Sequence, residues 1–246
     1  MIYAVKKGGP GQSVRSGVMN EEVKAMNVKE RLLAEKLVII SRSIPEEALL
    51  RCCEALLEAG VCCLESTFDH LLPDPIADNC AKLRAIRRAF GDRICLGVGT
   101  TLTVEEVQAA CDAGAEYVIS PSTKPAVIRE TRRLGMISIP GAMTPTEVCT
   151  AWDEGADIVK LFPADDLGLH YIQNLRGPLP HIPLMATGGV NPATIPQLLG
   201  AGVSAVGTGV TVLKKNLIAA GDYAAIRDLA RMHRDAIRIW EKENRA

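Results

Sequence analysis

Residues 154–163 have the sequence Glu154-Gly155-Ala156-Asp157-Ile158-Val159-Lys160-Leu161-Phe162-Pro163, in which a short apolar run follows a glycine at the end of a predicted helix. Glycine just past a helix supplies a left-handed cap, and a short apolar run is typical of a buried parallel strand. The same order recurs, with a glycine at position 60, 114 or 202 followed by an apolar run. The repetition indicates alternating helices and strands.

The rest of the chain completes this alternation. We expect strands at 37–41, 61–67, 94–99, 116–120, 136–139, 157–161, 183–187 and 204–207. We expect helices at 45–59, 74–90, 103–113, 125–134, 144–154, 168–176, 192–200 and 222–243, of which the one at 168–176 is short and weak. Such alternation implies a parallel sheet, and eight units in this length imply a closed barrel.

The predicted fold class is therefore α/β, a (β/α)8 TIM barrel with an N-terminal helix and a C-terminal helix. A doubly wound open sheet is the alternative, but no Gly-x-Gly-x-x-Gly follows the first expected strand. We expect residues 27–246 to form this single domain. Residues 1–26 are basic, glycine-rich and polar, and we expect them to be a flexible extension.

The composition favours small-molecule chemistry. The 246 residues carry a net charge of −1, which argues against nucleic acid or an anionic membrane as the partner. The eight cysteines form no Cys-x-x-Cys, and no signal peptide is in view, so we expect reduced thiols and a cytoplasmic location. The four histidines are scattered and give little support to a zinc site. No apolar run is long enough to span a membrane.

Lys160 is an ammonium group set into an apolar strand. Burial lowers the pKa of a lysine, and a lysine that is partly neutral at pH 7 is a nucleophile towards carbonyl compounds. The alternative is a strand-end lysine that reaches solvent or pairs with a carboxylate. In a (β/α)8 barrel the chemistry occurs at the carboxyl ends of the strands, where Lys160 is expected. This placement favours Schiff-base chemistry.

Glu65 follows the apolar residues Cys62-Cys63-Leu64 near the end of the second expected strand. Burial raises the pKa of a carboxyl group and suits it to general acid–base catalysis near neutral pH. We expect Glu65 to face Lys160 across the barrel mouth. A structural Glu65–Lys160 salt bridge is the alternative, but buried pairs of this kind are costly to form, which favours the catalytic role.

Two glycine turns, Thr187-Gly188-Gly189-Val190 and Gly207-Thr208-Gly209, end the seventh and eighth expected strands. Barrels often bind a phosphate here, because glycines let backbone N–H groups approach an anion. We predict an anion site at these turns, and two ordinary tight turns are the alternative. The run Gly97-Val98-Gly99-Thr100 offers a hydroxyl and N–H groups to a carboxylate, or serves only to open the helix expected at 103.

The chain resembles the class I aldolases that cleave 2-keto-3-deoxy-6-phosphogluconate (KDPG) and 4-hydroxy-2-oxoglutarate (KHG). The resemblance covers roughly residues 30–235, and its most specific part is the run from Lys160 to Ala164. The matching segments, in family order, are Leu64-Glu65-Ser66-Thr67, Gly97-Val98-Gly99-Thr100, Ile119-Ser120-Pro121, Ile139-Pro140-Gly141, Val159-Lys160-Leu161-Phe162-Pro163-Ala164 and Thr187-Gly188-Gly189-Val190.

This resemblance implies a role for each matching residue. Lys160 would form the Schiff base with the 2-keto acid, and Glu65 would be the general acid–base. Thr100 would hold the pyruvyl carboxylate, and Pro121 and Phe162 would wall the pyruvyl pocket. The remaining substrate-binding residues, which would hold the distal phosphate or carboxylate, are Thr187, Gly188, Gly189, Gly207, Thr208 and Gly209. The partners would be a small 2-keto acid and a phosphorylated aldehyde, and the protein would be a homotrimer without metal or cofactor.

Two positions depart from the family pattern. Many members carry an arginine four residues after the catalytic glutamate, where this chain has Asp69. An acid there would repel an anionic substrate unless His70, Arg42 or Lys124 compensates. Many members also carry a serine in the last glycine turn, where this chain has Gly209, and Thr208 is the candidate substitute for its hydroxyl. The aldehyde partner is therefore left open.

Three functions fit these residues. The first is a Schiff-base aldolase-lyase that cleaves a 4-hydroxy-2-keto acid, such as 2-keto-3-deoxy-6-phosphogluconate or 4-hydroxy-2-oxoglutarate, to pyruvate and an aldehyde. The second is another phosphate-binding barrel enzyme, an isomerase or a transferase like thiamine-phosphate synthase, which does not need a nucleophilic lysine. The third is a non-catalytic sugar-acid-binding or assembly protein. The positions of Lys160 and Glu65 favour the first.

Overall fold

The computed structural model describes residues 26–244, so the extension predicted at 1–26 falls almost entirely outside the described residues. Within them, parallel strands form one sheet in the order β5-β4-β3-β2-β1-β9-β8-β7-β6. The strands are β1 (Leu37–Ser41), β2 (Cys63–Thr67), β3 (Cys95–Gly99), β4 (Tyr117–Ile119), β5 (Ile137–Ile139), β6 (Gly141–Ala142), β7 (Val159–Leu161), β8 (Leu184–Thr187) and β9 (Ala205–Thr208).

The two edges of this sheet belong to one stretch of chain, because only Pro140 separates β5 from β6. Strand β5 pairs with β4, and β6 pairs with β7. Proline has no N–H to donate to a ladder, which explains the interruption, while its carbonyl accepts from the Lys160 backbone N–H at 2.8 Å. The barrel therefore closes with β5 and β6 as one broken strand, and the predicted (β/α)8 fold is confirmed.

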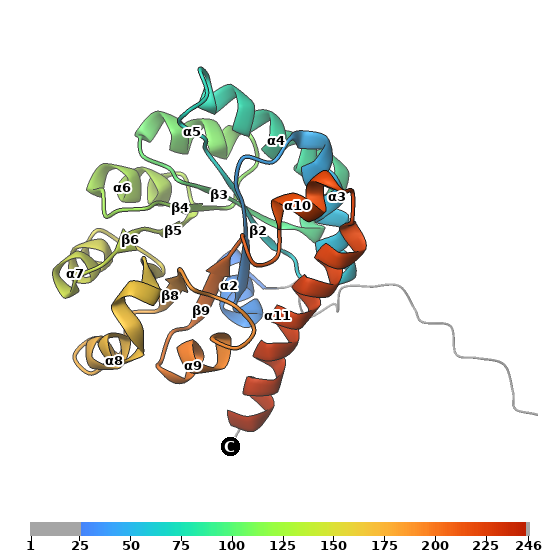
Figure 1. Cartoon of the computed structure of the whole chain (residues 1–246). Helices are drawn as coiled ribbons and strands as arrows, with labels where there is room; N and C mark the ends of the chain where they lie inside the picture. Colours follow the sequence, from blue (N-terminus) through green and yellow to red (C-terminus); the bar gives the residue numbers. More distant parts are fainter. Residues whose placement is uncertain (1–25, 245–246) are drawn as a thin grey trace, which may run out of the picture.

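Helices connect the strands and surround the barrel (Figure 1). Capping boxes start α2, α5 and α7, at Asn27, Thr103 and Thr144. None of the helices in residues 26–244 is both long and apolar enough to cross a membrane. The helices are α2 (Val28–Glu35), α3 (Glu46–Glu58), α4 (Pro75–Phe90), α5 (Val104–Asp112), α6 (Pro125–Arg133), α7 (Pro145–Asp153), α8 (Ala164–Arg176), α9 (Ile195–Gly200), α10 (Lys215–Ala219) and α11 (Tyr223–Asn244), with a 3-10 turn at Gly91–Arg93.

Two helices differ from the sequence expectation. Helix α8 begins at Ala164 rather than at 168, and Gly168, with a φ of 77°, interrupts it. Glycine is disfavoured inside helices, so the sequence pattern indicated only the part beyond Gly168. Helix α10 was not expected, because a helix this short carries too little periodicity to be recognised. Both helices follow strands whose carboxyl ends form the site described below.

Strand alternation decides which side chains face the barrel interior. A buried apolar cluster fills the part of the barrel interior nearer the amino ends of the strands, and it includes Cys63 of β2 and Ile158 just before β7. Successive side chains of a strand point to opposite faces, so the residue two positions further along points to the same face. Glu65 follows Cys63 in this way, and Lys160 follows Ile158. The polar side chains of Glu65 and Lys160 therefore lie next to this apolar cluster, on the side of the carboxyl ends of the strands.

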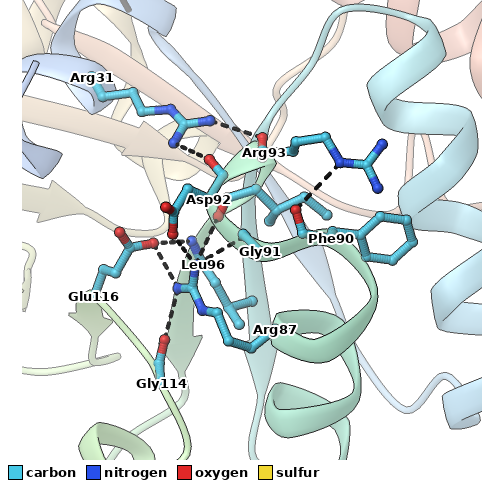
Figure 2. Close-up of polar contacts among 10 residues, drawn as sticks. Arg31, Arg87, Phe90, Gly91, Asp92, Arg93, Leu96, Gly114 and Glu116 are labelled. Atoms are coloured by element: carbon cyan, nitrogen blue, oxygen red, sulfur yellow. Dashed lines mark hydrogen bonds and ion pairs between the residues drawn. The ribbon is translucent and has the colours of Figure 1, made fainter. Parts of the chain in front are cut away.

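The amino ends of the strands are tied together by arginine side chains (Figure 2). Arg87 of α4 donates to the carbonyl oxygens of Gly91 and Gly114, at 3.0 and 2.8 Å, and to the Glu116 carboxylate at 2.8 Å. The same carboxylate oxygen accepts from the Leu96 N–H at 2.9 Å. These hydrogen bonds stabilise the end of the barrel that is remote from the polar side chains.

Candidate active site

A cavity of about 850 Å³ opens at the carboxyl ends of the strands. The chain segments that follow β1, β3, β7, β8 and β9 all contribute to its wall. Every residue that the sequence analysis assigned to catalysis or binding lines this one cavity: Glu65, Thr100, Pro121, Lys160, Phe162, Thr187, Gly188, Gly189, Gly207, Thr208 and Gly209.

Lys160 is 8% exposed, although it carries an ammonium group. Burial lowers the pKa of Lys160, the nearby Glu65 carboxylate opposes this shift, and the positive charge of Arg42 adds to it. The Nζ atom lies over the ring of Phe162, which closes the lysine off from solvent on one side. Lys160 is therefore a buried amine at the edge of an open cavity, as carbonyl attack requires.

Glu65 is 1% exposed, and its Oε2 atom has no hydrogen-bond partner among the described residues. Burial raises the pKa of Glu65, while Lys160 and Arg42 act in the opposite direction. Space for this carboxyl group comes from Gly99, because a Cβ at that position would overlap Glu65 Oε1. A buried carboxyl group with a free oxygen is suited to exchange protons with a ligand in the cavity.

Arg42 and Thr100 join the loops after β1 and β3 at the cavity mouth, through a bond of 3.1 Å from Arg42 Nη2 to Thr100 Oγ1. Thr100 has a φ of +58° and the adjacent loop residue Ser43 a φ of +53°, both in the left-handed region that favours glycine. Non-glycine residues with positive φ cluster at functional sites, where the surrounding structure holds them. Arg42 thus places a cation beside the predicted carboxylate-binding residue.

Asp69, the first departure from the family pattern, lies outside the wall of the cavity. Its carboxylate accepts from the Ser43 hydroxyl at 2.7 Å and from the Leu71 N–H at 3.2 Å. These hydrogen bonds lower the pKa of Asp69. The acid therefore holds the loop after β1 rather than facing an anionic substrate, while Arg42 of the same loop faces the cavity.

The glycine turns after β8 and β9 leave backbone donors free. The N–H groups of Gly188, Gly189 and Val210 donate to no acceptor within residues 26–244. Gly188 has a φ of +106° and Gly189 a φ of +65°, which other residues adopt only with strain. Free N–H groups in such turns bind anions well.

Gly209, the second departure from the family pattern, cannot be replaced by a residue with a side chain on this backbone. A Cβ at position 209 would overlap the carbonyl oxygen of Ile40. The neighbouring hydroxyl of Thr208 lies 2.7 Å from Thr211 Oγ1 and 3.2 Å from the carbonyl oxygen of Val190. The close approach of β1 and β9 thus explains the glycine.

Thr187 carries a second unpaired group, because its buried Oγ1 atom has no hydrogen-bond partner among the described residues. Thr187 is the last residue of β8, which lies in the sheet between β7, with Lys160, and β9, with Gly207. A buried hydroxyl without a protein partner in a cavity wall is free to bond a polar group of a ligand. Thr187 and Glu65 together therefore offer two such groups to the same ligand.

Several residues that line the cavity were not expected there from the sequence. Two are exposed lysines at its rim, Lys214 and Lys215, just before and at the start of α10. The missed residues lie in the segments after the first, seventh and last expected strands, so extending the carboxyl-end rule further into those segments would have found them. The missed residues with polar side chains are Ser43, Asn191, Thr211, Lys214 and Lys215, whereas Arg42 was expected only as a cation that could compensate for Asp69.

Within residues 26–244, histidine, cysteine and acidic side chains form no group of three or more that would hold a metal ion. The site consists instead of an amine, a carboxyl group, hydroxyls and free backbone N–H groups. Such a set is suited to bind an anionic carbonyl compound, and its amine is placed for covalent attack. A buried lysine beside a protonatable carboxyl group at the carboxyl ends of a (β/α)8 barrel is the arrangement that a class I aldolase, a carbon–carbon lyase, requires.

Comparison with known proteins identifies the family within this class. The sequence model of the family described as "KDPG and KHG aldolase" matches residues 28–229. The chain therefore belongs to the KDPG and KHG aldolase family, and it is an aldolase.

Individual relatives agree with this assignment. The 2-dehydro-3-deoxy-6-phosphogalactonate aldolase of Escherichia coli (strain K12) is 35% identical over 175 residues, which cover 70% of this chain and 82% of the relative. The 2-dehydro-3-deoxy-phosphogluconate aldolase of Treponema pallidum is 33% identical, covering 72% of this chain and 81% of the relative. A solved structure described as native KDPGal superimposes with a TM-score of 0.74 at 30% identity, covering 84% of this chain and 96% of that one.

These relatives decide between the functions considered from the sequence. The two named relatives are, by their names, sugar-acid aldolases. The Schiff-base aldolase prediction is confirmed at the level of the reaction class, and the isomerase or transferase alternative is not favoured.

Proposed function

We propose that this protein cleaves a 4-hydroxy-2-keto acid that carries a distal phosphate, and that it releases pyruvate and a phosphorylated aldehyde. Lys160 is the proposed nucleophile and Glu65 the proposed general acid–base. The observation that carries this proposal is the pair of opposed environments: burial lowers the pKa of Lys160 and raises the pKa of Glu65 in one cavity. Pairs of titratable groups with pKa values pushed in opposite directions are typical of acid–base catalysis.

The reaction begins with attack of the neutral Lys160 amine on the C2 carbonyl of the substrate. The carbinolamine that results loses water when the Glu65 carboxyl group protonates the departing hydroxyl, which leaves an iminium ion on Lys160 and a carboxylate on Glu65. Arg42 and Thr100 hold the C1 carboxylate in this scheme, supported by their contact at the cavity mouth. Phe162 and Pro121 wall the pyruvyl part.

Cleavage follows when the Glu65 carboxylate removes the proton of the C4 hydroxyl. The electron pair of the C3–C4 bond moves into the iminium ion, which becomes an enamine, and the aldehyde leaves. Protonation of C3 and addition of water to the iminium carbon then release pyruvate and the free Lys160 amine. The unpaired Thr187 hydroxyl is a second candidate to bond an oxygen of the substrate.

The distal end of the cavity supports a phosphate as the terminal group. Free N–H groups of Gly188, Gly189 and Val210 lie there, and Lys214 and Lys215 add positive charge at the rim. A dianionic phosphate gains more from two cations than a single carboxylate does. The named relatives act, by their names, on phosphorylated deoxy sugar acids, which agrees with this choice.

The proposed enzyme is a homotrimer in the cytoplasm, as the family resemblance implies. Exposed apolar side chains at Leu71 and Met143 support an interface with other copies of the chain. The eight cysteines all lie in the described part of the chain and are free thiols, which supports a reducing compartment. Sedimentation equilibrium should give three times the mass of one chain, and a monomer would refute this assembly.

Borohydride trapping with pyruvate tests the proposed mechanism. Reduction should fix a pyruvyl group on Lys160, which peptide mass spectrometry would locate. Lys160→Met should fold normally and form no adduct, whereas Lys124→Met, a lysine outside the cavity, should be labelled like the unmodified protein. An adduct on another lysine, or turnover by Lys160→Met near the normal rate, would disprove the assignment.

A substrate panel then tests the distal phosphate. The panel pairs 2-keto-3-deoxy-6-phosphogluconate and its C4 epimer with the same acids without phosphate, and adds 4-hydroxy-2-oxoglutarate. A phosphorylated acid should have the highest kcat/KM, and Lys214→Gln combined with Lys215→Gln should reduce that preference. A higher kcat/KM for 4-hydroxy-2-oxoglutarate would overturn the choice of phosphate over carboxylate.

A further inference from the structure

His233 is a buried polar residue that the proposed mechanism does not use. It lies on α11, far along the chain from the site residues, and is 1% exposed. Both of its ring nitrogens have partners: Nδ1 lies 2.8 Å from the carbonyl oxygen of Leu229, and Nε2 lies 2.9 Å from Thr211 Oγ1. Thr211 lines the cavity. His233 therefore connects the outer helix α11 with the site.

The partners of His233 determine where its proton lies. A carbonyl oxygen can only accept, so Nδ1 carries the hydrogen that is donated to Leu229. In the neutral ring Nε2 then accepts from the Thr211 hydroxyl. Burial lowers the pKa of His233, the bond to Leu229 opposes this shift, and the charge of Lys214 adds to it. The ring is therefore neutral near pH 7.

This arrangement also orients two hydroxyl groups. Because the Thr211 hydrogen is donated to His233, Thr211 Oγ1 accepts the hydrogen of Thr208 Oγ1, which lies 2.7 Å away. The same Thr208 hydroxyl lies 3.2 Å from the carbonyl oxygen of Val190 in the turn after β8, so its single hydrogen is shared between Thr211 Oγ1 and Val190. One imidazole thus anchors a chain of hydrogen bonds that joins the turn after β9 to the turn after β8.

We propose that His233 is a positioning residue for the distal phosphate: acting through Thr211 and Thr208, it holds the two glycine turns so that their free N–H groups converge on the anion. In this arrangement the Thr208 and Thr211 hydrogens are already donated within the protein, so Thr208 acts by positioning and the anion is bound through backbone N–H groups. The inference rests on the proposed function for the identity of the anion. Helix α11 thereby contributes to phosphate binding as well as to packing.

The test uses inorganic phosphate as the probe and the full-length protein. Phosphate should raise the Tm of the unmodified protein, because a ligand that binds only the folded state stabilises it. Thr211→Val and His233→Leu should each lose most of this phosphate-dependent shift, whereas His233→Gln, which keeps an acceptor towards Thr211, should retain part of it. His170→Leu, the same change at an exposed histidine, should behave like the unmodified protein.

Kinetics separates positioning from a general structural role. In Thr211→Val and His233→Leu the KM for the phosphorylated acid should rise about threefold to tenfold, which corresponds to the loss of one hydrogen bond. The rate of pyruvate trapping on Lys160, which does not involve the distal end, should stay the same. Because both variants break one chain, the double variant should show little further increase.

Different outcomes separate this inference from the proposed function. If pyruvate is not trapped on Lys160 of the unmodified protein, the proposed mechanism fails, and the phosphate-dependent Tm shift still tests His233. If that shift is absent from the unmodified protein, or is unchanged in both Thr211→Val and His233→Leu, the inference is refuted. Equal losses of pyruvate trapping and phosphate binding would also refute it, because they would indicate general unfolding. Should His233→Leu fail to fold, Thr211→Val decides the question from the cavity side.

Discussion

The Nζ atom of Lys160 lies 4.7 Å from the centroid of the Phe162 ring. The two residues are two positions apart at the end of β7, so strand alternation places both on the cavity side. The face of an aromatic ring attracts a cation, which favours the charged lysine, whereas burial favours the neutral amine. Phe162 therefore moderates the effect of burial while covering the amine on one side.

Replacing Phe162 should separate these two effects. Phe162→Leu keeps apolar cover but removes the ring, so the pKa of Lys160 should fall and pyruvate trapping should reach half its maximal rate at a lower pH. We expect kcat/KM at pH 7.5 to decrease about threefold, the size of a weak cation–π contact. Phe162→Tyr should match the unmodified protein in both measurements. A midpoint that rises in Phe162→Leu would contradict this account.

The pH dependence of trapping should respond in opposite directions to the two charges near Lys160. The Glu65 carboxylate favours the ammonium form and Arg42 opposes it. Glu65→Gln should therefore shift the half-maximal trapping rate to lower pH, and Arg42→Gln should shift it to higher pH. Trapping by the unmodified protein should increase with pH, because the neutral amine is the nucleophile. Shifts in the same direction would show that these charges do not control Lys160.

Glu65→Gln should also lower turnover. A positioned general acid–base contributes about 10²- to 10⁴-fold to a rate, so we expect kcat to fall by that amount. Glutamine keeps the shape and a hydrogen-bond donor, but it cannot exchange a proton. Steady-state assays with the best phosphorylated acid measure this loss, and a decrease of less than tenfold would remove Glu65 from the catalytic role.

Asp69 should be important for the loop after β1 although it lies outside the cavity. Asp69→Ala removes the acceptor of the Ser43 hydroxyl and frees a residue with a φ of +53° to relax. Because Arg42 precedes Ser43, the KM for the keto acid should rise about threefold, the effect of one lost hydrogen bond. Asp69→Asn keeps an acceptor and should remain close to normal. Equal KM values for all three proteins would show that the bond does not position Arg42.

Arg87 should contribute to stability and not to catalysis. Arg87→Met leaves the carbonyl groups of Gly91 and Gly114 without their donor, which we expect to lower the free energy of unfolding by about 2–4 kcal/mol. Arg88→Met, at an exposed position of the same helix, is the matched control and should change stability little. Urea unfolding measures both, and KM and kcat at 25 °C should be unchanged. A change in KM would show that the two ends of the barrel are coupled.

The local sequence was sufficient to predict the barrel and most of its site. Glycine caps followed by apolar runs mark the strands, because a helix end and a buried strand each depend on a few neighbouring residues. The positions of Glu65 and Lys160 followed from the same pattern, since residues at the carboxyl ends of barrel strands meet at one mouth. Pro140 and Gly168 interrupted a strand and a helix at points where the local rules for those residues apply, although neither break was predicted.

Only the tertiary structure revealed the contacts that adjust the site. Asp69 binds Ser43 across 26 residues of sequence, and Thr211 binds His233 across 22. Such contacts depend on how strands twist and how helices pack against them, and no local pattern contains that information. The sequence predicted that burial lowers the pKa of Lys160, but the opposing effects of Glu65 and Arg42 on that pKa depend on neighbouring strands and loops. Sequence identified the chemical groups, and the packing of distant segments determined their charge, orientation and surroundings.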